Sequence, residues 1–169
     1  INQVTYNFLT NEDITTTPTD GVYKFSNVKI YEGTSVSYSY TVDSSDVDQK
    51  FILSSNLADT TTLKVKVQNS SSDTTTNTYT KSQTLTELDS TSKVYFLQEC
   101  DDGRNEVYFG DGVLGKSLTD GNIITLEYIV TNKEVSNGAS SFALGGTVGG
   151  FTDVSISTVS VAQGGSVAQ

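Results

Sequence analysis

Residues 110–115 read GDGVLG, which matches the glycine fingerprint of dinucleotide-binding sites. Such a site needs a strand, then the glycines, then a helix whose N-terminus meets the pyrophosphate within a parallel βαβ unit. Residues 106–109 fit the strand, but residues 116–122 reach another Asp-Gly turn too soon for a helix to form. The Asp111 carboxylate would also repel a pyrophosphate at short range. The sequence therefore predicts no cofactor at this loop.

Turn geometry is the alternative reading of these glycines. Glycine adopts positive φ at no steric cost, and Asp-Gly pairs between apolar runs are a strong hairpin signal. We therefore predict that the loop is a turn between antiparallel strands. The residues assigned this structural role are Gly103, Gly110, Gly112, Gly115 and Gly121.

Catalytic groups are scarce. The chain has no histidine, which excludes Ser-His and Cys-His pairs and the usual zinc sites. Paired carboxylates can hydrolyse glycosides, and Glu99, Asp101, Asp102 and Glu106 crowd one expected hairpin. A hairpin turn would leave them in solvent, and the chain has no tryptophan to form a sugar platform. The sequence predicts no catalytic residues and no enzyme.

Calcium is the better candidate among small ligands, because aspartate and asparagine oxygens in glycine turns can bind it. The eligible residues form two groups: Asp101, Asp102 and Asn105, and Asp111, Asp120 and Asn122. Neither group has the spacing of the twelve-residue calcium loop. We predict no metal site, and a calcium ion in the acidic turns stays open. The single cysteine, Cys100, excludes an intramolecular disulfide.

The charge balance bears on possible partners. Twenty acidic and ten basic residues give a formal net charge of −10. Nucleic acid and anionic membrane surfaces are poor partners for such a chain, and no apolar run reaches membrane-spanning length. Methionine is absent, including at position 1. We therefore expect the chain to be a piece of a longer protein.

Composition and alternation indicate an all-β fold. Serine, threonine and tyrosine are abundant and Pro18 is the only proline, which suits pleated surfaces joined by turns. The predicted architecture is an antiparallel β-sandwich or partly open barrel of hairpins, with long polar loops and very little helix. Strands are expected at 22–31, 34–42, 49–54, 63–68, 77–81 and 93–98, at two further places before residue 131, and at 154–161.

Three regions are expected along the chain. Residues 1–21 are a poorly patterned N-terminal segment, 22–161 an all-β domain, and 162–169 a frayed end or cut linker. A β submodule is possible at about 46–131. Threonine clusters occur at 15–17, 60–62 and 74–76, and the first and third are expected to be loop tips.

A linear order of turn and strand signatures carries a family resemblance. It runs through YFLQE at 95–99, DGR at 102–104, EVYFGDG at 106–112, Gly115, DGN at 120–122, ITLEY at 124–128 and NGASSF at 137–142. This order resembles the baseplate wedge proteins of contractile-tailed bacteriophages, within the wider baseplate J-like family. The likeness extends back through YEGTSVSYSYTVD at 31–43, so that it covers about 22–169.

The resemblance implies a structural virion protein of the tail baseplate, assembled in the host cytoplasm. It implies that other phage baseplate and tail proteins are partners and that the full-length protein is a homo-oligomer. It further implies a part in the rearrangement that triggers sheath contraction. The long helical parts that members use for dimerisation are not in this sequence. The alternative is a surface-binding β-sandwich, an adhesin or carbohydrate-binding module, suggested by the Ser/Thr richness and by Tyr38 and Tyr40.

Overall fold

A computed structural model describes residues 4–84 and 86–166. The chain divides into two compact units, Ile1–Gly33 together with Asn132–Gln169, and Thr34–Thr131. In the first unit, β1 (Phe8–Leu9) pairs antiparallel with β2 (Tyr31–Glu32), and a 3-10 helix, η1, covers Lys133–Ser136. The domain boundaries expected from the sequence stay predictions.

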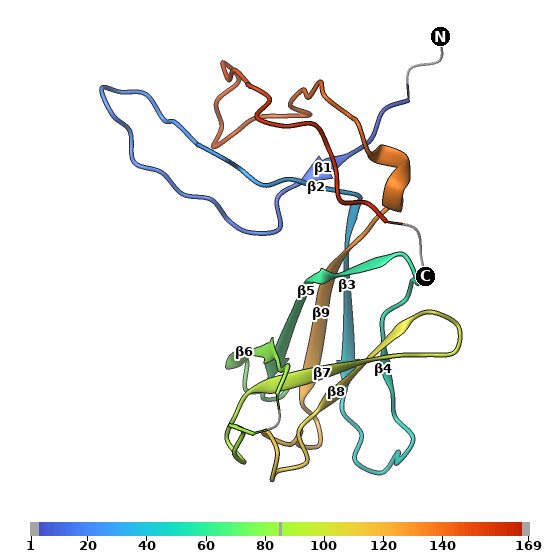
Figure 1. Ribbon diagram of the computed structural model, residues 1–169. Coiled ribbons are helices and arrows are strands. Elements are labelled where there is room, and N and C mark those ends of the chain that lie inside the picture. The colour runs from blue at the N-terminus through green and yellow to red at the C-terminus, as the bar shows by residue number, and fades with distance from the viewer. Residues whose placement is uncertain (1–3, 85, 167–169) are drawn as a thin grey trace. The chain divides into compact units, whose positions relative to one another are not determined.

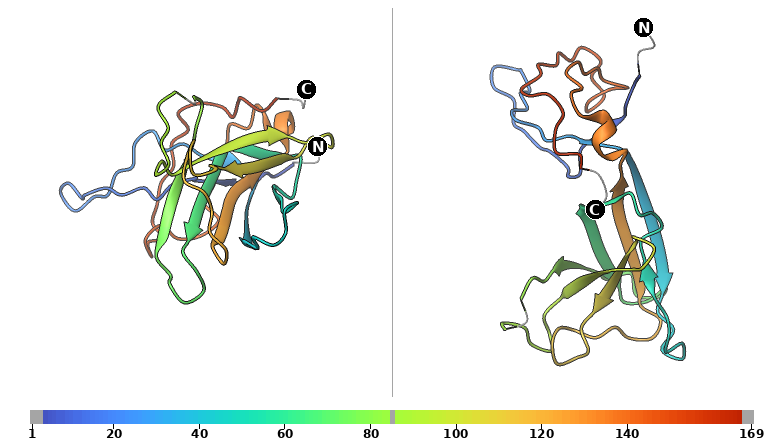
Figure 2. Two further views of the ribbon diagram at one scale, coloured as in Figure 1. Left: turned by 90° about the horizontal axis from the view of Figure 1, so that it is seen from below. Right: turned by 45° about the vertical axis from the view of Figure 1, so that its right-hand side comes forward.

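The second unit is built on one seven-stranded sheet. Its strands are β3 (Thr34–Thr41), β4 (Phe51–Ile52), β5 (Ala58–Gln68), β6 (Thr76–Lys81), β7 (Val94–Glu99), β8 (Asn105–Phe109) and β9 (Ile123–Val130). Their order is β3-β9-β5-β6-β7-β8-β4. The sheet curls so that β3, β9 and β5 form one wall and β7, β8 and β4 cross opposite to it (Figures 1 and 2). The nearly all-β, partly open barrel predicted from the sequence is confirmed.

One strand pair departs from the antiparallel pattern. Strands β6 and β7 run parallel, with Thr80 opposite Val94 and Lys81 opposite Tyr95. Only the last two residues of β6 pair with the first two of β7, so β7 continues onward from the end of β6. A tight turn cannot make this connection, because it would reverse the chain.

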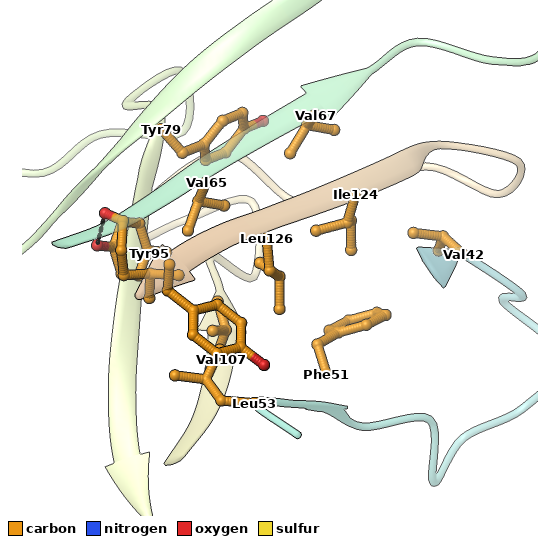
Figure 3. Close-up of a cluster of buried hydrophobic side chains, with 12 residues drawn as sticks. Val42, Phe51, Leu53, Val65, Val67, Tyr79, Tyr95, Val107, Ile124 and Leu126 are labelled. Carbon is orange, nitrogen blue, oxygen red and sulfur yellow. Dashed lines mark hydrogen bonds between the residues drawn. The ribbon is translucent and has the colours of Figure 1, made fainter. Parts of the chain in front are cut away.

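The core lies between the two walls (Figure 3). Alternation on β5 and β9 sends Val65, Ile124 and Leu126 inward, all at 0% exposure, where they meet Leu53 and Val107 from the opposite wall. Burial of an aliphatic side chain of this size contributes about 1.5–3 kcal/mol before the entropy of ordering the chain is subtracted. The packing of this face explains why the alternation at 63–68 predicted its strand correctly.

Two predicted strands are wrong. Of the expected 22–31 strand, only Tyr31 lies in a strand, β2, while Val22 forms an isolated bridge with Thr19; residues 154–161 contain no strand. Their apolar side chains are largely in solvent: Val22 is 65% exposed and Val159 is 78% exposed. Alternation produces a strand only where a neighbouring strand supplies ladder hydrogen bonds and a face to bury against. Within the described residues, 23–30 and 154–161 have no such neighbouring strand.

The threonine cluster at 60–62 belongs to a strand. It lies inside β5, at a register shift between Asp59, opposite Ile129, and Lys64, opposite Glu127. Thr62 is 1% exposed; its hydroxyl donates to the Asp59 carbonyl at 2.8 Å and accepts from the Ile129 N–H at 2.9 Å. The hydroxyl thus replaces ladder bonds that the bulge interrupts.

Side chains of β3 and β9 reach across to β4 and to the residues that follow it. The Tyr40 hydroxyl donates to the Ile52 carbonyl at 2.7 Å, and its ring lies 5.6 Å from that of Phe51. The Tyr128 hydroxyl lies 2.8 Å from both the Ser54 N–H nitrogen and the Ser54 Oγ. Burial is the largest cause that raises the pKa of Tyr40. Two phenol hydroxyls therefore hold the short edge strand and the residue after it to the opposite wall.

Tyr128→Phe should lower the free energy of unfolding by about 1–2 kcal/mol, because the Ser54 N–H loses its acceptor while the ring remains. Urea unfolding followed by circular dichroism measures this. Tyr23→Phe, at a half-exposed ring, is the control and should leave stability unchanged. Equal stability of Tyr128→Phe and the parent would show that the bond contributes nothing net.

Candidate functional site

The glycine loop joins two strands that are not neighbours. Strand β8 lies between β7 and β4, whereas β9 lies between β3 and β5. The prediction that the loop is the turn of a hairpin is therefore wrong: residues 110–122 carry the chain from one wall to the other. Asp-Gly signals report a local reversal, and they carry no information about which strand the chain joins afterwards.

Inside the loop, two glycines approach each other closely. A Cβ placed on Gly110 would lie 2.2 Å from the carbonyl carbon of Gly115. Gly115 has φ +94°, and its own Cβ would meet Val94 Cγ2 at 3.0 Å. The Gly112 N–H donates to the Gly115 carbonyl at 3.0 Å and closes the loop. The short distance between Gly110 and Gly115 leaves no room for a side chain.

The closed loop docks on the segment before β7 through backbone bonds. The Gly115 N–H donates to the Asp89 carbonyl at 3.0 Å, and the Lys116 N–H donates to the Ser92 carbonyl at 2.8 Å. The Asp89 carboxylate in turn accepts from the Thr91 N–H at 2.8 Å and the Ser92 hydroxyl at 2.9 Å. The loop is thus a packing element of the barrel end.

A nucleotide cradle would need free N–H groups in this loop. The Asp111 carboxylate accepts from the Val113 and Leu114 N–H groups, both at 2.8 Å. These two bonds, that from Leu114 first, hold the pKa of Asp111 below its usual range. A carboxylate already occupies the donors that a phosphate would use, so the arrangement does not suit pyrophosphate.

Addition of NAD or ATP should leave the melting temperature of the chain unchanged, because a ligand stabilises only the state that binds it. Differential scanning fluorimetry at millimolar nucleotide tests this. A clear upward shift that Asp111→Asn enlarges would contradict it and restore the nucleotide interpretation.

The other glycines assigned a structural role lie in separate turns. Gly103 sits between β7 and β8, which pair antiparallel as predicted, and its N–H donates to the Cys100 carbonyl at 2.9 Å. The Gly121 N–H donates to the Val42 carbonyl at 2.9 Å. Positive φ angles occur at Gly103, Gly112, Gly115 and Gly121, and Gly110 is not among them. Their structural importance stays a prediction, which substitution can test.

Several candidate side chains for calcium binding have separate partners. Asp102 pairs with the Arg104 guanidinium at 2.7 Å, and Asp120 accepts from the Ser44 N–H at 2.9 Å. Asn122 accepts from the Thr119 N–H at 2.7 Å. Across residues 4–84 and 86–166, no group of three or more His, Cys, Asp or Glu side chains could hold a metal ion.

Five aspartates have a pKa lowered by hydrogen bonds in the folded chain: Asp43, Asp73, Asp89, Asp102 and Asp111. Such a carboxyl stabilises the fold above its unfolded pKa of about 3.9, and this contribution is lost as the pH falls through the lower folded value. The stability difference between the parent and Asp111→Asn should therefore be largest near neutrality and shrink below about pH 4. Urea unfolding across the pH range measures it; a difference that grows on acidification would contradict the assignment.

Sequence reasoning missed a pocket beside β4. This open pocket of about 470 Å³ is lined in part by Val47, Phe51 and Leu118. Lys50 lies 3.5 Å from Glu106, which is only 6% exposed. No sequence pattern marks this pocket, because its residues come from three separated segments. Its charged lining side chains are Asp48, Lys50 and Glu106.

The proposed sugar platform is reduced to one ring. Tyr38 is 44% exposed, whereas Tyr40 is half-buried and its hydroxyl donates a hydrogen bond to the Ile52 carbonyl.

No helix in the part of the chain that the structure describes is long and apolar enough to cross a membrane.

Comparison with known proteins gives two matches that agree. The family model of the bacteriophage baseplate wedge protein gp6, third domain, matches residues 36–141, well over half of the chain. Baseplate wedge protein gp6 of Enterobacteria phage T4 is 32% identical over 82 residues, which cover 40% of this chain and 12% of that protein. The family match begins in β3 and ends beyond η1, so it contains the whole barrel except the first residues of β3. The chain belongs to the third-domain family of the bacteriophage baseplate wedge protein gp6.

Proposed function

We propose that this chain is an assembly module of the tail baseplate in a contractile-tailed phage. It contacts neighbouring tail proteins and takes part in the rearrangement that triggers sheath contraction. The observation that carries the proposal is the family match at 36–141, which falls on the curled seven-stranded sheet and its glycine loop.

Two features of the chain support a structural role without turnover. The conspicuous glycine motif is closed on itself and bonded to residues 89–92. The carboxylates that could do acid–base chemistry hold turns or pair with nearby cations. We propose that the protein is not an enzyme and that it acts by binding neighbouring proteins through its surface.

The wider parts of the proposal concern the whole protein. The chain spans 12% of the length of the T4 relative, so partners are proposed for a larger polypeptide. We propose that this polypeptide is a homo-oligomer, that it belongs to the baseplate J-like group, and that it is assembled in the host cytoplasm. Stable contacts between such subunits should bury about 1,200 Å² or more of total surface.

An epitope inserted after Ser71 in the phage gene tests the location. Ser71 and Ser72 are exposed at a loop tip between β5 and β6, so the insertion should leave the barrel intact. Antibody labelling and electron microscopy of intact particles should place the epitope at the tail baseplate. An epitope on a capsid protein of the same phage is the control.

Labelling along the sheath, on the capsid or on no part of viable particles would overturn the proposal. Particle maps recorded before and after contraction test the proposed part in the rearrangement. The barrel should change its neighbours between the two states; identical contacts in both would remove the part in rearrangement while leaving the location intact.

A further inference from the structure

Strand β3 is the long edge of the barrel sheet. It pairs with β9 on one side only, from Thr34 opposite Val130 to Thr41 opposite Ile123. The Val42 N–H donates to the Asn122 carbonyl at 2.8 Å, so even-numbered residues direct their backbone groups to β9. Odd-numbered residues direct theirs to the open side, as shown by the Thr41 carbonyl, which accepts from Gln49 Nε2 at 2.9 Å.

The open side carries a row of backbone groups that have no strand partner within residues 4–84 and 86–166. It consists of the N–H and C=O groups of Ser35, Ser37 and Ser39, and all three residues are exposed. Proteins usually protect such an edge with charged side chains, proline, a bulge or very short length. Residues 34–41 have no charge, no proline and an uninterrupted register. The opposite edge, β4, is only two residues long.

Tyr38 marks where the core is open beside this edge. Its register partner is Leu126, which is fully buried, so Tyr38 lies on the inward face of the sheet. The residue is nevertheless 44% exposed, because no strand lies beside it on the open side of β3 within the described residues. An apolar residue on a strand added beside β3 would cover this ring, since inward side chains of adjacent strands pack together.

Charge at one end of the edge sets the chemistry of the partner. Beyond Thr41 the chain enters an exposed turn with Asp43, Asp46 and Asp48, and the whole chain has a net charge of −10. A second copy of this chain would bring the same negative charge. A segment with lysine or arginine at the end that passes this turn is complementary to it.

We propose that the free edge of β3, residues 34–39, binds an extended segment of another protein as an added antiparallel strand. The segment places an apolar side chain over Tyr38 and a basic N-terminal end beside residues 43–48. Strand addition gives affinity through main-chain bonds and specificity through alternate side chains. The inference goes beyond the assembly role, because the edge belongs to the barrel whatever particle contains it.

The test uses a synthetic peptide that alternates valine and serine after two N-terminal lysines. On titration into the whole chain, amide hydrogen exchange at Ser35, Ser37 and Ser39 should slow at least about tenfold, and NMR shifts should concentrate on β3. The same peptide with two glutamates in place of the lysines should bind about tenfold more weakly, a difference that fades in high salt. Binding without protection of these amides, or equal binding of both peptides, would overturn the proposal.

Two variants examine the edge directly. Ser37→Pro removes an N–H that faces the open side, so the β3–β9 ladder survives while the added strand loses a donor. Ser37→Lys places a charge at the centre of the edge. Both should weaken peptide binding at least about tenfold, whereas Ser72→Lys in the distant loop tip should not. Unchanged binding to Ser37→Lys in a correctly folded chain would overturn the proposal. So would a dimer of the free chain that Ser37→Lys dissociates, because the occupant would then be a second copy.

Discussion

Gly110→Ala should destabilise the second unit by about 3 kcal/mol or more, as expected for a steric overlap in a packed region. The added Cβ would lie 2.2 Å from the Gly115 carbonyl carbon and 2.3 Å from its oxygen. Both atoms belong to backbone that is bonded to Gly112 and Asp89, so neither can rotate away. Urea unfolding of the parent and the variant measures the difference.

Gly121→Ala separates this clash from backbone strain. Gly121 has φ +78° with nothing within 4 Å of an added Cβ, so alanine there meets strain alone. We expect it to cost about 1 kcal/mol. If Gly110→Ala cost no more than Gly121→Ala, the close contact between Gly110 and Gly115 would not be a constraint on the fold.

Thr62→Val should cost about 2–3 kcal/mol, although valine has nearly the same shape. The Thr62 hydroxyl bonds both the Asp59 carbonyl and the Ile129 N–H, and the residue is 1% exposed. Valine would leave both backbone groups buried without partners. The loss should appear in the free energy of unfolding and as faster exchange of the Ile129 amide.

Thr62→Ser is the matched control, because it keeps the hydroxyl and loses a methyl group. It should cost about 1 kcal/mol. A Thr62→Val protein as stable as Thr62→Ser would show that water replaces the hydroxyl in the bulge.

The strands that could be predicted from the sequence are those with a buried face. At 34–42, 63–68 and 124–128 the alternation coincides with real pairing, because the inward residues meet the core. The same alternation at 154–161 failed, since no strand partner exists there within the described residues. Periodicity reports the shape that a segment can adopt, and long-range pairing decides whether it does so.

The glycine loop shows the same limit at the candidate site. Its failure as a nucleotide cradle could be predicted from Asp111 and from the missing helix. Its course from β8 to β9 could not, because strand order depends on which distant edges meet. Thr62 was hidden in a polar cluster for a related reason: a buried threonine and a loop threonine have the same local sequence.

The barrel is nested within the other unit along the chain. Residues 1–33 and 132–169 belong to one unit, and the barrel is everything between them. Its first and last strands are β3 and β9, and Thr34 lies opposite Val130, so the chain enters and leaves at one end of the same ladder. Tension applied at these two points would unzip the ladder one pair at a time and would not load all of its bonds together. Under such tension the barrel would unfold progressively, beginning at the Thr34–Val130 pair.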